Sequence, residues 1–170
     1  MKVAPEGPEV ANPINEGIFD EPSISRQWVA RRLQRALTVE RWGGPARTGL
    51  SRVAGKEGRL LVEQGKSAEE RTRVLESLIR DVGAEPYSTL GIGAPTTRFI
   101  TALLGRTSGY LTRRLANLIA EHTLSEYRSL EALVENAPGV PADLLDRVTP
   151  MRAQSAEELE ALARSRETRA

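Results

Sequence analysis

The stretch APTTRFITALLGRTSGYLTRRLANLIAEHTLSEYRSLEALVEN, residues 94–136, decides the expected fold. Its one proline, Pro95, lies near the start, where a helix tolerates proline. Leucines recur at steps of seven, four and three residues, the period of one helix face, at Leu104, Leu111, Leu115 and Leu118. The stretch therefore predicts a long helix that ends near Asn136.

A first helix is predicted upstream, over residues 24–42. Ser23 is a favourable N-cap residue, and the run Gly43-Gly44-Pro45 is expected to end the helix. One side of this helix carries Val29, Leu33, Ala36, Leu37 and Glu40. This side is expected to be buried, which places a carboxylate inside an apolar stripe.

The next segment, residues 46–64, is predicted to be weaker helix, because it holds three glycines, each unfavourable in a helix interior. Ser67 and Glu70 have the spacing of a capping box, which predicts a fresh helix start there and a split second helix. Ser155 and Glu158 repeat that spacing, so the last helix is expected over residues 155–166.

A short helix is expected over residues 142–148, before Pro150. Between the predicted helices no alternating apolar pattern indicates a strand. The expected fold is all-α, a four-helix bundle with a split second helix and short extra C-terminal helices. Residues 1–22 read as an acidic, proline-rich N-terminal arm, and residues 23–170 as the helical bundle domain.

Composition limits the chemistry. The 170-residue chain carries a net charge of only +1, so its charge gives no overall signal for DNA or RNA. It has no cysteine, which excludes disulfides and thiolate sites, and its single histidine excludes an ordinary His-rich zinc or iron site within one subunit. No apolar run reaches the ~20 residues that cross a bilayer, so a cytoplasmic location is expected.

Four glutamates occur once per predicted helix, as a di-metal carboxylate site in a bundle requires. They are Glu40, Glu70, Glu121 and Glu158. Four carboxylates can bridge two cations, iron or manganese, with histidines as end ligands. This set is the candidate metal site.

Three segments carry a resemblance to a known family: ALTVERWGG (residues 36–44), GRTSGYLTRRLANLIAEHTLSEY (residues 105–127) and SAEELEALA (residues 155–163). They resemble ligand segments of the ferritin-like proteins of the Coq7 type, the demethoxyubiquinone hydroxylases. The resemblance implies a ferritin-like bundle and a di-iron monooxygenase that acts on a quinone at a membrane surface.

The chain departs from this family at the histidines. Where the second helix of the family has Glu-x-x-His, the chain has Glu70 followed three residues later by Arg73, which cannot ligate a metal. Ala161 and Tyr127 stand at the two other histidine positions. The expectation is a ferritin-like protein that has lost its di-iron site.

Each glutamate also has a structural interpretation. Glu70 and Glu158 could serve only in capping boxes, and Glu121 could be a solvated or salt-bridged residue. Glu40 needs a buried partner, and Arg73 is the expected one, a cation in place of the former metal. Glu57 is a second inward-facing carboxylate. His122 is more often a satisfied interior or boundary histidine than a ligand.

Other residues suggest contacts with a partner. Ile18 and Phe19 are the only bulky pair in the N-terminal arm, which is expected either to be a floppy terminus or to dock through this pair on its own bundle or on a partner. Residues 86–120 contain no acid, and they carry the basic residues Arg98, Arg106, Arg113 and Arg114. The bland interpretation is a solvated basic face. The alternatives are an acidic protein, anionic lipid or RNA.

The first functional hypothesis is a structural or protein-interaction component without a cofactor, with a protein partner or a second copy of the chain. The second is a metal-dependent oxidoreductase that keeps a di-iron or di-manganese site. The third is a helical adaptor whose basic face contacts RNA or a membrane surface.

Overall fold

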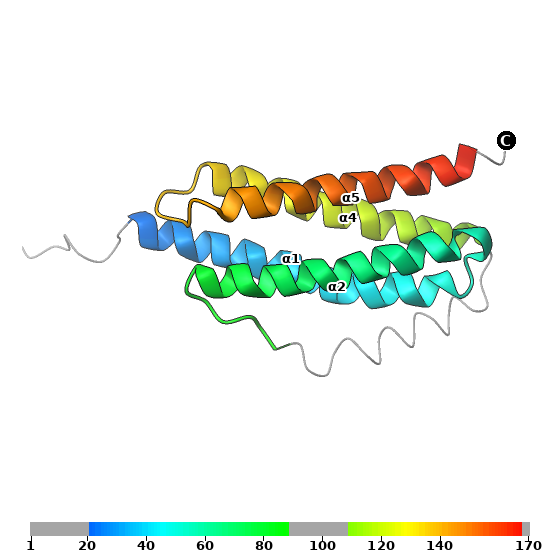
Figure 1. Cartoon of the computed structure of the whole chain (residues 1–170), viewed down its shortest axis with the longest axis horizontal. Helices are drawn as coiled ribbons and strands as arrows, with labels where there is room; N and C mark the ends of the chain where they lie inside the picture. The colour runs from blue at the N-terminus through cyan, green and yellow to red at the C-terminus, as the bar shows by residue number, and fades with distance from the viewer. Residues whose placement is uncertain (1–20, 89–108, 168–170) are drawn as a thin grey trace, which may run out of the picture.

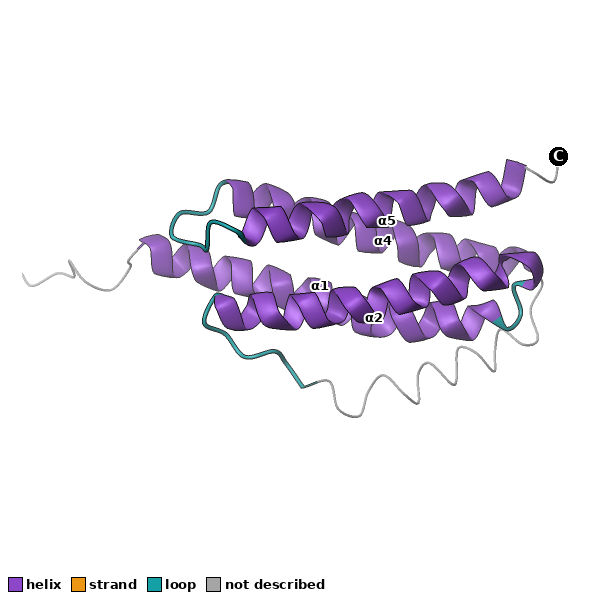
Figure 2. Cartoon of the chain, in the orientation of Figure 1, coloured by secondary structure: helices purple, strands orange, loops and turns teal. Residues whose placement is uncertain are grey.

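The computed structural model describes residues 21–88 and 109–167, and within them the chain is all-helical, with no strand (Figures 1 and 2). Four helices pack together. They are α1 (Glu21–Ser51), α2 (Gly58–Asp81), α4 (Gly109–Glu135) and α5 (Leu144–Glu167), with a short 3₁₀ turn η1 (Gly55–Glu57) before α2. The predicted all-α four-helix bundle is confirmed.

The bundle has two layers, α1 beside α2 and α4 beside α5, and α1 also packs on α4 (Figure 1). The chain after α2 contacts the first half of α1, since the Tyr87 N–H donates to Gln34. The start of α4 lies at the opposite end, where Arg113 pairs with Glu57. α2 and α4 therefore run parallel, and the connection between them begins and ends at opposite ends of the bundle.

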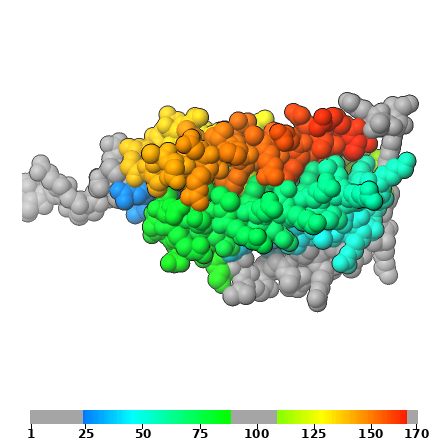
Figure 3. All heavy atoms as spheres, in the orientation of Figure 1, coloured from blue at the N-terminus to red at the C-terminus, as the bar shows by residue number. Residues whose placement is uncertain are grey.

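The hydrophobic core has two clusters with a polar layer between them. One cluster fills the end formed by the first half of α1, the second halves of α2 and α4 and the start of α5, and includes Leu33, Leu78 and Leu130. The other fills the opposite end and includes Leu50 and Leu61. Figure 3 shows α5 lying against α2 on the viewed face.

The first helix is longer than predicted, because α1 continues through Gly43-Gly44-Pro45 to Ser51. Packing between α1 and α2 explains two glycines, Gly44 of α1 and Gly65 of α2. A Cβ on Gly44 would lie 3.1 Å from the Cβ of Ala68, and one on Gly65 would lie 2.6 Å from Oγ1 of Thr48. The glycines thus allow α1 and α2 to approach closely, and tertiary contacts override the local stop signal.

The two capping-box predictions are wrong. Ser67 lies inside α2, which runs unbroken from Gly58, so the second helix is not split. Ser155 lies inside α5, buried, and its hydroxyl donates to the carbonyl of Met151. The expected short helix and last helix are one helix that passes through exposed Pro150. A proline removes a single helical hydrogen bond, and packing along α5 offsets that loss.

Some expectations fall outside the described residues. Ile18, Phe19, Arg98 and Arg106 are among them, as are residues 94–108 of the long predicted helix. Glu21 and Pro22, assigned to the arm, belong to α1. None of the helices in residues 21–88 and 109–167 combines the length and the apolar character that a bilayer crossing needs.

Candidate functional site

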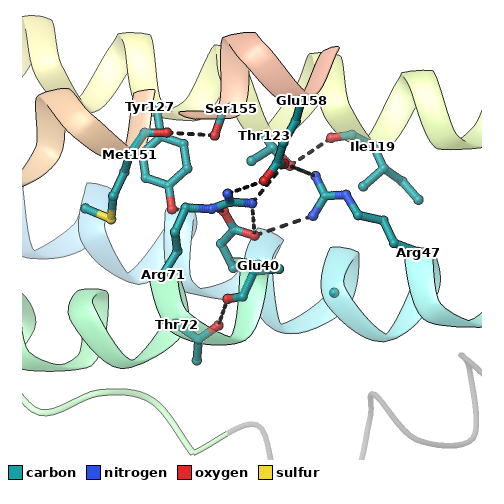
Figure 4. Close-up of polar contacts among 12 residues, drawn as sticks. Glu40, Arg47, Arg71, Thr72, Ile119, Thr123, Tyr127, Met151, Ser155 and Glu158 are labelled. Carbon is teal, nitrogen blue, oxygen red and sulfur yellow. Dashed lines mark hydrogen bonds and ion pairs between the residues drawn. The ribbon is translucent and has the colours of Figure 1, made fainter. Parts of the chain in front are cut away.

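Four charged side chains meet in the polar layer between the two core clusters (Figure 4). They are Glu40 and Arg47 of α1, Arg71 of α2 and Glu158 of α5, and we call them the central charge cluster. Their side chains are 0%, 0%, 2% and 9% exposed, respectively. Two arginines and two glutamates balance in charge, so the cluster as a whole is neutral.

Arg71 lies between the two carboxylates and is bonded to both. Its Nε donates to Oε1 of Glu40 at 2.6 Å, and its Nη2 reaches Oε2 of Glu40 at 3.3 Å. Toward Glu158, Nη1 donates to Oε1 at 2.5 Å and Nη2 to Oε2 at 3.1 Å. Both pairings are two-pronged, the strong arrangement for a guanidinium with a carboxylate.

Arg47 is held less tightly. Its Nη1 lies 3.6 Å from Oε2 of Glu40, and its Nη2 lies 3.8 Å from Oε2 of Glu158. Nη2 also donates to Oγ1 of Thr123 at 3.2 Å. Within the described part of the chain, Nε and Nη1 donate no hydrogen bond. Arg47 therefore has ion-pair partners but keeps two donors without an acceptor.

Neutral side chains complete the cluster. The hydroxyl of Tyr127 on α4 donates to Oε1 of Glu40 at 2.9 Å, and the amide of Gln64 donates to the carbonyl of Glu158 at 2.9 Å. The Thr123 hydroxyl donates in turn to the Ile119 carbonyl. All four helices are thus joined through one polar network. The network fixes how the helices are aligned along their lengths, as well as which helices are in contact.

Burial and charge shift the titration of three members. Burial by itself would lower the pKa of Arg71, but Glu40 and Glu158 raise it above the ordinary value. Burial lowers the pKa of Arg47, since its looser contacts with the two carboxylates only partly offset desolvation. Burial, and then the negative charge of Glu40, raise the pKa of Tyr127, so it stays a neutral donor.

The structure brings together two of the four candidate metal ligands, Glu40 and Glu158. The other two, Glu70 and Glu121, are exposed on the outside of α2 and α4. The interpretation of Glu158 as only a capping residue is wrong, because its carboxylate is buried against Arg71. The burial of Glu40 and the solvated position of Glu121 are confirmed.

The expected partner of Glu40 is corrected. Arg73 is exposed, and the guanidinium on Glu40 belongs to Arg71, two residues earlier. Arg71 precedes Leu75 and Leu78 by four and seven residues, so it shares their buried face. Helix periodicity could have identified it, whereas the search for a Glu-x-x-His motif pointed to position 73. Arg47 lies seven residues after Glu40 on the same face of α1, but beyond the predicted end of that helix at residue 42, so the sequence did not place it.

A di-metal centre does not fit this donor set. Over residues 21–88 and 109–167, no three His, Cys, Asp or Glu residues converge as metal ligands. The two carboxylates that do meet are each held by a guanidinium, which stays protonated and cannot ligate. A cation entering between Glu40 and Glu158 would have to displace Arg71.

The other predicted site residues lie away from the cluster. Glu57 is buried as expected and pairs with half-buried Arg113 at 3.7 Å. Arg114 is exposed on α4, near the exposed side chains of Tyr110 and Leu118. His122 is also exposed. Of the two predicted basic residues in the described part of the chain, Arg114 is exposed, whereas Arg113 is half-buried and its charge is partly neutralised by Glu57.

Comparison with known proteins gives no relative: no protein-family model, curated protein or solved structure matches the chain.

Proposed function

We propose that this protein is a ferritin-like, Coq7-like bundle in which buried arginines take the place of a di-metal centre, and that it acts by binding rather than by catalysis. The observation that carries the proposal is the position of Arg71, bonded to Glu40 and Glu158 at the centre of the bundle. A guanidinium there supplies the positive charge that a metal would otherwise supply to these carboxylates.

The topology supports the ferritin-like part of the proposal. α2 and α4 are parallel (Figure 1), so the connection that joins them begins at one end of the bundle and ends at the other. A single long crossover of this kind is typical of ferritin-like bundles, whereas simple up-and-down bundles have only short loops. The carboxylates of Glu40 and Glu158 lie in the core of the bundle, where ferritin-like proteins carry their metal ligands.

The chemistry of the cluster supports the absence of catalysis. A redox metal site needs ligands that can exchange and an open position for oxygen. Here the acidic oxygens accept hydrogen bonds from Arg71 and Tyr127, and all the members are buried. Such a network favours a rigid bundle, which presents its outer surface to a partner. The described surface best suited to this is the α4 face around Tyr110, Arg114 and Leu118.

Metal analysis tests the proposal. Protein purified from iron-supplemented cells is expected to hold less than about half an equivalent of iron or manganese, because two carboxylates beside fixed cations make a poor site. Two tightly bound irons per chain, lost in Glu40→Ala, would contradict it and support an oxidoreductase.

A pair of histidine substitutions tests the replacement of metal by arginine. Arg71→His removes the fixed cation and places a nitrogen donor between Glu40 and Glu158, so bound iron should rise. Arg73→His is the matched control, because residue 73 is exposed on the same helix. It should bind no more iron than the wild type. Equal iron content in the two variants would argue against a former metal position at the cluster.

A further inference from the structure

An apolar slot of about 400 Å³ lies between α1 and α4. Its lining is apolar along most of its length and combines buried residues with half-buried ones. The buried ones are Gly43 and Leu50 of α1, and the half-buried ones are Val39, Trp42 and Ala46 of α1 with Leu115 and Ile119 of α4. Because most of these side chains are partly exposed, a ligand can enter the slot from solvent.

The dimensions of the slot suit one unbranched chain. From Thr38 to Leu50 the lining follows α1 for about 18 Å, at 1.5 Å per residue. A volume of about 400 Å³ over that length leaves a mean cross-section of only about 22 Å². An extended alkyl chain fits such a cross-section along its whole length, whereas a fused ring system of equal volume would be too short and too wide.

The slot has one polar end and one apolar end. Since α1 and α4 run antiparallel (Figure 1), Leu50 and Leu115 line one end, and Thr38 and His122 line the other. Leu111, one turn before Leu115, is partly exposed and continues the apolar end. Thr38 and His122 are both exposed. This polarity matches an amphiphile whose head group lies beside His122.

Positive charge is in excess beyond the polar end. Glu126, one turn after His122 on α4, pairs with Arg35 at 2.8 Å and with Arg32 at 3.6 Å. Within residues 21–88 and 109–167, these two guanidiniums share that one carboxylate, and they are 60% and 39% exposed, respectively. Glu121 is exposed too, but it lines a separate hollow on the other side of α4. A negatively charged head group therefore complements this end of the slot.

We infer that the slot binds a medium-chain fatty acid of about ten carbons, with its alkyl chain between α1 and α4 and its carboxylate beside Arg35 and His122. Burial of the chain supplies the affinity, and the charged head sets its direction. An imidazole offers at least one N–H donor whatever its charge, so His122 can donate to the carboxylate. This site goes beyond the proposed function and does not depend on the central charge cluster.

Three soluble probes separate the chain from the head: decanoate, decylammonium with the same chain length and the opposite charge, and butanoate with the same head and a short chain. Binding is followed by the indole N–H signal of Trp42 in an NMR titration of the full-length Trp28→Phe protein at pH 7. Trp28 is exposed, and the chain has two tryptophans, so this variant leaves one indole as the reporter.

Decanoate is expected to shift the Trp42 signal with a Kd on the order of 0.1 mM, which is reasonable for a ligand of its size. Decylammonium should bind at least about tenfold more weakly, because its charge is repelled where that of decanoate is attracted. Butanoate should cause no saturable shift, because its chain is too short to fill the slot.

Two pairs of variants locate the ligand. Arg35→Gln should weaken decanoate binding about fivefold, the effect of one exposed ion pair. Arg73→Gln is the matched control, since it makes the same charge change at an exposed position of α2 and should alter Kd by less than about twofold. Ala46→Phe fills the slot and should abolish binding, whereas Ala163→Phe, at an exposed position of α5, should not.

Four results would overturn the inference. They are an unmoved Trp42 signal with decanoate, equal affinity for decylammonium, equal Kd values in Arg35→Gln and Arg73→Gln, and a Trp42 signal that shifts on dilution of the protein alone. The last result would mean that a second copy of the chain covers the slot. Helical circular dichroism shows whether each variant is folded. If Ala46→Phe is unfolded, the three probes and the two arginine variants decide the outcome.

Discussion

The Nε of Arg71 donates a 2.6 Å hydrogen bond to Oε1 of Glu40, joining the centres of α1 and α2 inside the bundle. The same guanidinium is bonded to Glu158 of α5, and Tyr127 of α4 completes the contact with Glu40. One arginine therefore links three helices directly and the fourth through a shared carboxylate.

Tyr127→Phe removes the hydroxyl that donates to Glu40. The expected loss is about 1.5–3 kcal/mol in the free energy of unfolding, because the acceptor is a buried charge.

The pKa of Tyr127 is raised in the folded protein, so wild-type stability should be full below about pH 10 and fall above it, where the unfolded chain loses the proton first. Urea unfolding from pH 8 to 11 measures this slope, which should be shallower in Tyr127→Phe. Parallel pH profiles of stability in the wild type and in Tyr127→Phe would contradict the buried position of the Tyr127 hydroxyl beside Glu40.

Gly65→Ala tests the close approach of α1 and α2. The new Cβ would lie 2.6 Å from Oγ1 of Thr48 and 3.3 Å from the carbonyl oxygen of Gly44. We expect a loss of about 1–3 kcal/mol in thermal or urea unfolding, although alanine is the better helix former. Adding Thr48→Ala should recover much of the loss, since it removes the nearest atom. A Gly65→Ala protein more stable than the wild type would show that the helices are not in contact there.

Replacing the whole charged set tests whether it is needed for stability. A variant with Glu40→Met, Arg47→Met, Arg71→Met, Glu158→Leu and Tyr127→Phe should be as stable as the wild type, or up to about 4 kcal/mol more stable, because the cost of burying the charges disappears. The check is a single cooperative urea transition at an equal or higher midpoint. A clear fall in the midpoint would mean that the buried ion pairs, rather than the two hydrophobic clusters around them, hold the bundle together.

The sequence and the structure agree where burial follows helix periodicity. Glu40 lies in the stripe of Leu33 and Leu37, and it is buried as that stripe predicts. The all-α class followed for the same reason. The periodic spacing of apolar residues arises from the core that they form, so it predicts burial reliably.

Local signals for helix boundaries were less informative than the apolar periodicity. Pro45 and Ser67 looked like helix boundaries but lie inside α1 and α2, since packing between these helices outweighs a single unfavourable residue. The partner of Glu40 was missed because a motif from a resembling family directed attention to Arg73. The rule that placed Glu40, one buried face for each helix, also places Arg71.

The double-mutant cycle of Glu40 and Arg71 tests the central claim most directly, with the free energy of unfolding measured in urea at pH 7. Glu40→Ala and Arg71→Ala should each cost about 3–5 kcal/mol, because each strands a buried charge. The double variant should cost less than the sum by about 1–3 kcal/mol, and exposed Arg73→Ala should cost no more than about 0.5 kcal/mol. Additive losses at positions 40 and 71, or a loss in Arg73→Ala as large as that in Arg71→Ala, would contradict a buried bridge between Glu40 and Arg71.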